Sequence, residues 1–299
     1  MTNSTPTPTR KNPLVLIIAA LIGMQLLGAL TFPVAKFGLG SIEPFTFAFY
    51  RFLISSIVLL AMVALGKKGV PIAKSDRWKI VGLGFLIIPL NQVTYLFGQS
   101  LTGVGHGSFL FATTPIWIFI AALIHLKEKL VIRRAVGIVI AMAGVVAIMT
   151  SGAIVISADY LWGDLIILVA VIAWAYYSVF GKPLVEKYGA VRVTAYALAS
   201  GSVLYFPFGL YSAIAFDYSA VPAGAWLSVL YVAVGTSVGA YTLWYWVLKQ
   251  MEVSRIAVYH NAQPIIATVV ANLWLGEQFG PMFLIGGIVI LVGVITAEL

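Results

Sequence analysis

The sequence predicts an all-α polytopic membrane protein whose ten transmembrane helices form two inverted five-helix repeats. Three observations predict it: the composition, an internal repeat, and the distribution of lysine and arginine along the chain. Of the 299 residues, 61% are hydrophobic and only 9% are charged, and the mean hydropathy is +1.02. Soluble domains carry about 25% charged residues. Lipid must therefore be the solvent for most of this chain.

The internal repeat consists of four landmarks that recur at one offset of 149 residues. Pro115, Glu128, Gly137 and Gly144 are matched by Pro264, Glu277, Gly286 and Gly293. Each copy lies in a half of the chain that holds five apolar spans. Because five is odd, the second copy enters the membrane upside down relative to the first. Many secondary transporters use such inverted repeats to build a central site with two alternating exits.

Each predicted helix is an apolar stretch long enough for the hydrocarbon core, which needs about 20 residues per crossing. The ten helices are expected over residues 14–36, 44–65, 78–99, 105–126, 131–150, 161–181, 191–215, 224–248, 254–275 and 281–298. Residues 1–13 are expected to form a disordered cytoplasmic tail, residues 14–150 the first repeat, and residues 155–299 the second, inverted repeat. The connecting loops are short and leave no room for a soluble domain.

Lysine and arginine gather on one side of this predicted topology. All but two of the 18 lie in the N-terminal tail or in the connections after the second, fourth, sixth and eighth helices; the exceptions are Lys36 and Arg51. The positive-inside rule then places both termini in the cytoplasm. Sidedness also accounts for the net charge of +8, so we expect no nucleic-acid partner.

Several kinds of chemistry are absent from the sequence. The chain has no cysteine, which excludes disulfides and thiolate metal sites. Gly235-Thr-Ser237-Val-Gly239 fits the nucleophile elbow of hydrolases, but that motif requires a strand-to-helix turn and these residues lie inside an apolar helix. We therefore expect no enzyme activity, no cofactor and no metal site. An intramembrane enzyme or a channel is the less favoured alternative from another class.

Nine polar or aromatic side chains are candidates to line a substrate cavity. Polar groups inside a membrane are costly unless they face the interior of the bundle. Aromatic rings and uncharged hydrogen-bonding groups suit an organic substrate with an apolar side chain. For each residue the alternative role is helix packing or, near a helix end, the interfacial aromatic belt. The candidates are Asn91, Tyr95, Thr114, Trp117, Trp174, Tyr177, Tyr241, Tyr259 and Gln263.

Pro115 and Pro264 lie near the middle of the fourth and ninth predicted helices. Proline removes a backbone hydrogen bond and kinks a helix, so we expect both residues to act as hinges that gate the path. The alternative is a static kink that aids packing. Glu128 and Glu277 end the same two helices, and we expect each to cap or brace the helix that follows.

Arg51 is the single cation inside a predicted span. We expect a structural role, in which its long side chain reaches toward Glu43 or a helix C-terminus. The alternative is capture of a substrate carboxylate. No aspartate or glutamate lies near the centre of any span, which favours facilitated diffusion or exchange over obligatory proton coupling.

These features resemble the drug/metabolite transporter superfamily, EamA type. Pro115-Ile-Trp with Glu128, Pro264-Ile-Ile with Glu277, the segment from Ala29 to Lys36, and Tyr50-Arg51-Phe52 carry the resemblance, which covers residues 14–298. Within the superfamily the chain looks most similar to the YddG-type amino acid exporters. The resemblance implies a central cavity formed mainly by helices 1, 3, 4, 6, 8 and 9.

The function implied is export of aromatic and other neutral amino acids and related metabolites across a bacterial inner membrane by alternating access. The expected partners are a small-molecule substrate and the lipid bilayer, and the expected state is a monomer. A drug exporter or a sugar-phosphate or nucleotide-sugar exchanger of the same fold is the alternative. Phosphate-bearing substrates would require several lysines or arginines in the cavity, and this sequence offers only Arg51 and Lys36.

Overall fold

The computed structural model describes residues 14–66, 69–101, 110–111, 113–150, 161–259, 266 and 281–298. Within these residues the regular structure is helical and contains no strand. The helices are α1 (Leu14–Leu39), α2 (Pro44–Leu65), α3 (Lys74–Phe85), η1 (Leu86–Val93), α4 (Thr94–Ser100), α6 (Thr114–His125), α7 (Ile132–Thr150), α8 (Leu161–Tyr188), α9 (Ala190–Ala215), α10 (Ala223–Tyr231), η3 (Val232–Ala240), α11 (Tyr241–Leu248), α12 (Val253–Tyr259) and α14 (Pro281–Glu298).

Six of the described helical segments are long and apolar enough to cross a membrane. They cover Leu14–Thr31, Pro44–Leu65, Lys74–Gly98, Leu161–Tyr188, Ala190–Ala215 and Ala223–Leu248. Two shorter apolar helices cover Thr114–His125 and Ile285–Ala297. Large hydrophobic side chains remain exposed along these helices, for example Phe208 and Ile214 on α9. The prediction of an all-α polytopic membrane protein is therefore confirmed.

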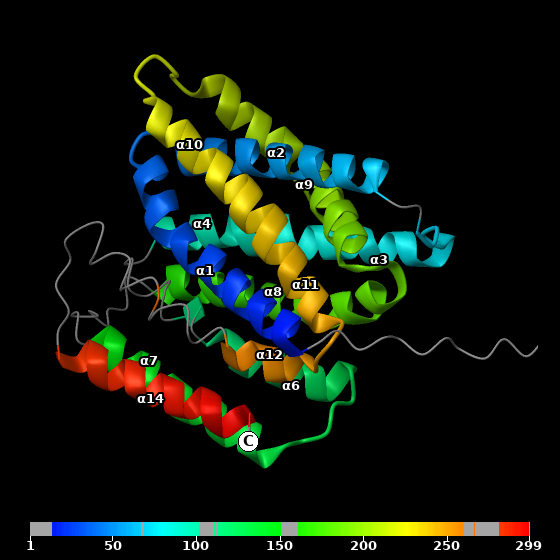
Figure 1. Cartoon of the computed structure of the whole chain (residues 1–299). Coiled ribbons are helices and arrows are strands. Elements are labelled where there is room, and N and C mark those ends of the chain that lie inside the picture. The colour runs from blue at the N-terminus through cyan, green and yellow to red at the C-terminus, as the bar shows by residue number, and fades with distance from the viewer. Residues whose placement is uncertain are drawn as a thin grey trace, which may run out of the picture.

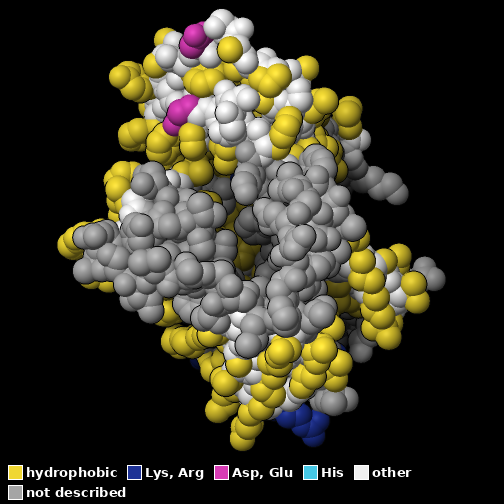
Figure 2. Space-filling view, turned by 90° about the vertical axis from the view of Figure 1, so that its left-hand side faces the viewer, with side chains coloured by type: hydrophobic (Ala, Val, Ile, Leu, Met, Phe, Trp, Pro, Cys, Tyr) yellow, Lys and Arg dark blue, Asp and Glu magenta, His cyan; other side chains and the backbone are white. Residues whose placement is uncertain are grey.

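The two ends of the bundle differ in charge. The connections from α2 to α3, α6 to α7, α8 to α9 and α11 to α12 lie toward the right of Figure 1, and we call this side the basic end. The connections from α1 to α2 and α9 to α10 lie at the left, which we call the opposite end. Figure 2 views the opposite end, where the described surface is mostly hydrophobic and Lys or Arg appears only at the lower edge.

Helices at equivalent positions in the two halves pack against each other. The second helix of each half forms the α2–α9 pair, and the fifth forms the α7–α14 pair. Helix α1 packs on η3 and α11, and in the same way α8 packs on η1 and α4. The α2–α9 pair is antiparallel, because Thr46 bonds to Ser212 while Ser56, ten residues on, bonds to Ser202, ten residues back. This is the packing that inverted repeats produce.

The repeated glycines meet one another between α7 and α14. A Cβ atom added to Gly137 would lie 2.6 Å from the carbonyl oxygen of Gly293, and one added to Gly144 would lie 2.6 Å from the carbonyl oxygen of Gly286. Small residues allow helices to approach this closely in a membrane. Any larger side chain at these positions would force the two helices apart.

Two helices change from α to π geometry halfway along. The third helix runs through α3, η1 and α4, and the eighth through α10, η3 and α11. The π segments begin at Leu86 and Val232, in the third helix of each half of the chain. Pro89 lies inside η1 and cannot donate a backbone hydrogen bond. The sequence predicts unbroken helices here, so the π segments are a departure, and such segments are frequent at functional sites.

Candidate functional site

Arg51 lies about 10 Å inside α2, between the two π-helical regions. Its Nε donates to Ser237 Oγ at 2.9 Å, its Nη1 to Gln92 Oε1 at 3.0 Å, and its Nη2 to the Tyr241 hydroxyl at 3.3 Å. We call Arg51, Gln92, Ser237 and Tyr241 the arginine hub. Gln92 belongs to η1 of the first repeat, whereas Ser237 and Tyr241 belong to η3 and α11 of the second. The hub therefore links the two repeats.

The partners of the Arg51 guanidinium are all neutral oxygens. The ring of Phe52 lies 4.8 Å from its Cζ atom and adds a weak cation–π contact. The expected pairing of Arg51 with Glu43 is wrong. Glu43 instead caps α2 by accepting from the Thr46 backbone N–H at 2.9 Å and from Ser212 Oγ at 2.6 Å.

The carboxyl of Glu43 stays ionised because of these bonds. Burial alone would raise its pKa, but hydrogen bonds from Ser212 and from residues at the start of α2 outweigh burial and keep the pKa below the usual glutamate value. The carboxylate of Glu43 thus binds the N-terminus of α2 and Ser212 of α9. It does not neutralise Arg51.

Asn91 supports the hub from behind. Its Nδ2 donates to the carbonyl oxygen of Ala170 in α8 at 2.8 Å, and its Oδ1 accepts from Gln92 Nε2 at 2.6 Å. The side chain is fully buried. The structure therefore places Asn91 between the third helix and α8, where it orients Gln92.

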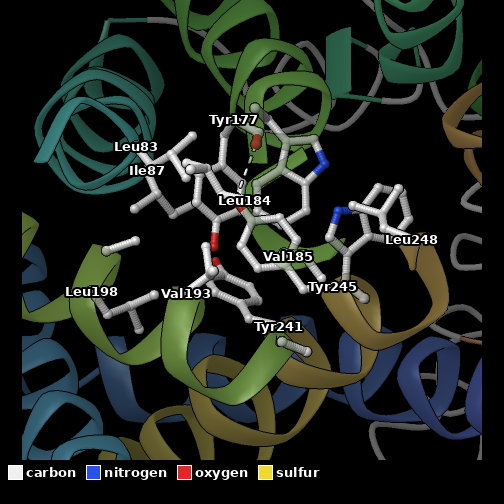
Figure 3. Packing of buried hydrophobic residues seen from close by; sticks show 14 of the residues in the cluster. Leu83, Ile87, Tyr177, Leu184, Val185, Val193, Leu198, Tyr241, Tyr245 and Leu248 are labelled. Carbon is white, nitrogen blue, oxygen red and sulfur yellow. Dashed lines mark hydrogen bonds between the residues drawn. The ribbon is translucent and has the colours of Figure 1, made fainter. Parts of the chain in front are cut away.

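Aromatic side chains of α8 and α11 continue from the hub. The ring of Trp174 lies 5.2 Å from that of Tyr241, 5.5 Å from that of Tyr177 and 6.0 Å from that of Trp244. The rings of Tyr177 and Tyr245 stack at 4.8 Å. We call these five residues the aromatic cluster. Figure 3 shows Tyr177 of α8 among Leu83 and Ile87 of the third helix, with Tyr241 and Tyr245 reaching it from α11.

Polar atoms inside the aromatic cluster are only partly satisfied. Trp244 Nε1 donates to Ser178 Oγ at 3.1 Å, and the Tyr245 hydroxyl donates to the carbonyl oxygen of Tyr177 at 3.0 Å. The hydroxyl of Tyr177 lies beside Tyr245 and is buried without a hydrogen-bond partner of ordinary geometry among the described residues. A buried hydroxyl without a partner is unfavourable by about 1–3 kcal/mol. The cluster is therefore a packed aromatic region in which the Tyr177 hydroxyl can still form a hydrogen bond.

The structure brings three of the nine candidates, Trp174, Tyr177 and Tyr241, into one cluster and leaves others elsewhere. Tyr95 contacts Phe111 edge to face at 4.9 Å, and Trp117 Nε1 donates to Thr113 Oγ1 at 3.1 Å. Thr114 is buried and bonds to the carbonyl oxygen of Phe111. Tyr259 packs partly buried against the main hydrophobic core. Gln263 lies outside the described residues.

Pro115 does not lie in the middle of a continuous helix. Helix α6 begins at Thr114, which puts Pro115 in its first turn, where the missing N–H has no intrahelical partner to lose. Thr113, just before it, is a turn residue. A proline in this position starts a helix instead of bending one. Pro264 lies outside the described residues.

Glu128 connects the repeats at the basic end. Its Oε1 accepts from the Val253 N–H at 2.9 Å, and its Oε2 accepts from Ser254 Oγ at 2.5 Å. Arg134 donates to Ser254 Oγ at 3.0 Å and forms an ion pair with Glu252. We call this group the basic-end clamp. The expectation that Glu128 braces the following helix is wrong, because its carboxylate binds the start of α12 and not α7; Glu277 lies outside the described residues.

A groove of about 530 Å³ opens at the opposite end between the start of α2, the third helix and the end of α9. Its lining includes Glu43, Phe97, Tyr205, Tyr211 and Ser212. None of the nine candidate residues lines this groove, so it is separate from the hub and the aromatic cluster.

Three polar residues that the structure singles out were not among the sequence candidates. Gln92 and Ser237 join the hub, and Ser237 belongs to the motif that only resembles a hydrolase elbow. Gln25 of α1 is buried, and neither its amide nitrogen nor its amide oxygen has a hydrogen-bond partner among the residues that the structure describes. A glutamine in the centre of an otherwise apolar span was the available signal for Gln25.

Comparison with known proteins identifies the relatives of this chain. The sequence model of the EamA-like transporter family matches residues 14–150 and again residues 161–297. The chain is 31% identical over 276 residues to an uncharacterized transporter of Archaeoglobus fulgidus, covering 90% of this chain and 93% of that protein. It is 27% identical over 286 residues to the uncharacterized transporter YyaM of Bacillus subtilis, covering 94% and 93%.

One relative carries a substrate in its name. The chain is 26% identical over 276 residues to a probable terminal-alkyne amino-acid exporter of Streptantibioticus cattleyicolor, covering 92% of this chain and 91% of that protein. A solved crystal structure shares the fold with a TM-score of 0.78 at 20% identity, covering 95% of this chain and 96% of the other.

Proposed function

We propose that this chain, which belongs to the EamA-like transporter family, exports aromatic and other neutral amino acids and related small metabolites by alternating access. In this it would act like the YddG-type exporters that its sequence resembles. The bilayer and a small-molecule substrate are its partners, and it works as a monomer without a cofactor or a catalytic step.

The observation that carries the proposal is the continuity of the arginine hub and the aromatic cluster through Tyr241. The Tyr241 hydroxyl accepts from Arg51, and its ring lies 5.2 Å from that of Trp174. One edge of the region therefore offers a cation and neutral hydrogen-bonding groups, and the other offers aromatic rings. An amino acid with an apolar side chain has the matching polar and apolar halves. The amino-acid exporter among the relatives supports the same class.

Alternating access requires each end of the bundle to close in turn. The basic-end clamp supports a closed basic end, because Glu128 and Arg134 of the first repeat hold Glu252, Val253 and Ser254 of the second. Opening that end would separate these groups. The break before Pro115 would allow α6 to move as the clamp opens, and we propose the same hinge role for its repeat partner Pro264.

The charge difference between the two ends supports a proposed orientation in the membrane. With the basic end in the cytoplasm of a bacterial cell, both termini are cytoplasmic and the groove at the opposite end faces outward. A cysteine placed at Lys249, in a chain that has none of its own, would then react with an impermeant maleimide only after the inner membrane of intact cells is opened. Labelling in sealed cells would contradict the orientation.

Counterflow tests the substrate class. Purified protein in liposomes is loaded with one unlabelled compound, and entry of radiolabelled phenylalanine is followed. Internal phenylalanine, tryptophan or methionine should accelerate entry, while sugar phosphates should not. Acceleration by sugar phosphates alone would identify an anion exchanger, and acceleration by no amino acid would refute the proposed class.

A further inference from the structure

We propose that Arg51 binds the carboxylate of the transported amino acid, so that the arginine hub is the polar half of the substrate site. This inference rests on the proposed function and names the chemical group that the site recognises. It gives Arg51 the role that the sequence left as the less favoured alternative, and the geometry of the hub carries it.

Arg51 has no acidic partner among the described residues. A guanidinium inside the bundle is unfavourable by several kcal/mol unless an anion pairs with it. The three groups that accept from Arg51 are neutral, and none of the ion pairs within the described residues includes it. Glu43, the nearest acid along α2, is occupied by Thr46 and Ser212. Within the described residues, the chain therefore retains a cation inside the bundle that no acidic side chain neutralises.

The Arg51 guanidinium has more N–H donors than its partners accept within the described residues. A guanidinium carries five N–H groups in a planar fork. Ser237, Gln92 and Tyr241 each take one, which leaves one N–H on each terminal nitrogen without an acceptor in the described part of the chain. Two parallel N–H groups are what a carboxylate accepts in a bidentate pair.

The hub holds the guanidinium firmly. Gln92 is oriented by Asn91, which is itself bonded to the Ala170 carbonyl of α8. Ser237 donates to the carbonyl oxygen of Val232 at 3.3 Å, five residues back, within the π-helical ladder of η3. Both π segments thus supply an acceptor whose direction is fixed by a second bond. A preoriented cation loses little side-chain entropy when a carboxylate arrives.

The hub also places the rest of the substrate. Tyr241 belongs to both the hub and the aromatic cluster. A carboxylate on Arg51 therefore positions the substrate side chain toward the ring of Trp174. Gln92 of the first repeat and Ser237 of the second both accept from Arg51. A ligand bound to Arg51 would therefore be coupled to both repeats.

The experiment compares ligands on the wild-type protein first, so that it does not depend on a variant that folds. L-phenylalanine, phenethylamine (which lacks the carboxylate) and L-phenylalaninamide (in which it is neutral) compete against radiolabelled phenylalanine in counterflow, and their effect on thermal unfolding is measured in parallel. Because either analogue leaves the Arg51 guanidinium without a carboxylate partner, both should compete at least ~30-fold more weakly than phenylalanine.

Variants then assign the effect to Arg51. Arg51→Gln should weaken phenylalanine binding at least ~30-fold and bring phenylalanine and phenethylamine to similar affinity, while Arg51→Lys should restore part of the preference. Arg77→Gln removes the same charge from an exposed site on α3 and should change neither value. Size-exclusion chromatography and the unfolding curve establish that each variant is folded.

Each outcome is decisive. Equal competition by phenylalanine and phenethylamine in the wild type, or an unchanged ratio in Arg51→Gln, would overturn the role of Arg51 and leave the amino acid exporter standing. No response of the wild type to any of the three compounds would refute the proposed substrate class, and this inference with it.

Discussion

Asp76 and Arg51 are both ionised side chains with three polar partners, yet the chain treats them in opposite ways. Asp76, at the basic end, accepts from Lys79 and Lys187 at 2.8 Å and from the Tyr188 hydroxyl at 2.7 Å. Its charge is matched by two cations of the same chain. Arg51, in the middle of the bundle, receives three neutral oxygens.

The difference runs against what stability alone would select. Both charges need a partner, because Asp76 is buried and Arg51 lies about 10 Å inside α2, where a lone charge is costly. Among the described residues, Asp76 is paired with two cations and Arg51 receives only neutral partners. Asp76 therefore joins α3 to the end of α8, whereas the neutral partners of Arg51 are those expected of a cation that binds the proposed substrate carboxylate.

The largest expected effect separates transport from stability at Arg51. Arg51→Met should reduce phenylalanine counterflow at least ~30-fold while leaving the melting temperature unchanged or higher, because an apolar side chain removes an unneutralised buried charge. Gln92 and Ser237 keep their other hydrogen bonds. The measurement is counterflow beside thermal unfolding of the same preparation. A large loss of stability would mean that Arg51 is structural.

The second effect concerns Glu128, a carboxylate that binds chiefly neutral donors of the other repeat. Glu128→Gln should favour opening of the basic end by about ten-fold, since hydrogen bonds to a charged group are worth roughly 1.5–3 kcal/mol. Ala257, buried on α12, is changed to cysteine as a reporter in this cysteine-free chain. Its maleimide labelling should accelerate, while a cysteine at exposed Lys249 should label equally in both backgrounds.

A smaller effect is expected at Asp76, and it should fall on stability alone. Asp76→Asn leaves Lys79 and Lys187 without their partner and should lower the melting temperature by a few degrees, with counterflow retained within about three-fold. Lys74→Gln, an exposed change on the same helix, is the control. Transport lost in a folded Asp76→Asn protein would remove the contrast between the two sites.

The smallest effect is a pH dependence at Glu43. Burial raises the pKa of Glu43 in the folded protein, but hydrogen bonds from Ser212 and Thr46 lower it by more, so the net shift is downward. The stabilisation is therefore present above the usual glutamate pKa and is lost as the pH falls through the lowered value. Because Glu43 is partly exposed, it should contribute less than about 1 kcal/mol. Glu43→Gln should flatten the fall in melting temperature that thermal unfolding shows over roughly pH 5 to 3.

The helices were predictable because lipid imposes a simple rule on the sequence. Every crossing needs a long apolar stretch, so the predicted spans 44–65 and 281–298 coincide with α2 and α14. The glycines Gly137 and Gly144 were recognised from their spacing, and the structure places both in the contact with α14.

The contents of the site were less predictable, because they depend on partners far away in the chain. Arg51 meets Gln92 across 41 residues and Tyr241 across 190, and Glu128 meets Val253 across 125. No local pattern encodes such meetings. The change from α to π geometry at Leu86 and Val232 also escaped, since it adds one residue per turn without altering the apolar pattern. Trp174, Tyr177 and Tyr241 were found because aromatic residues deep in a span carry their own signal.

The crossed glycine contacts bear on how the chain arose. Gly137 faces Gly293 and Gly144 faces Gly286, so each glycine of one copy meets the counterpart of its neighbour and not its own counterpart. This exchange is what a two-fold rotation between identical partners generates. Two separate five-helix chains, inserted in opposite directions, could form the same seam without a peptide link. Fusion of their genes would then have fixed the stoichiometry and let each half diverge, so that one copy could acquire a residue such as Arg51 independently of the other.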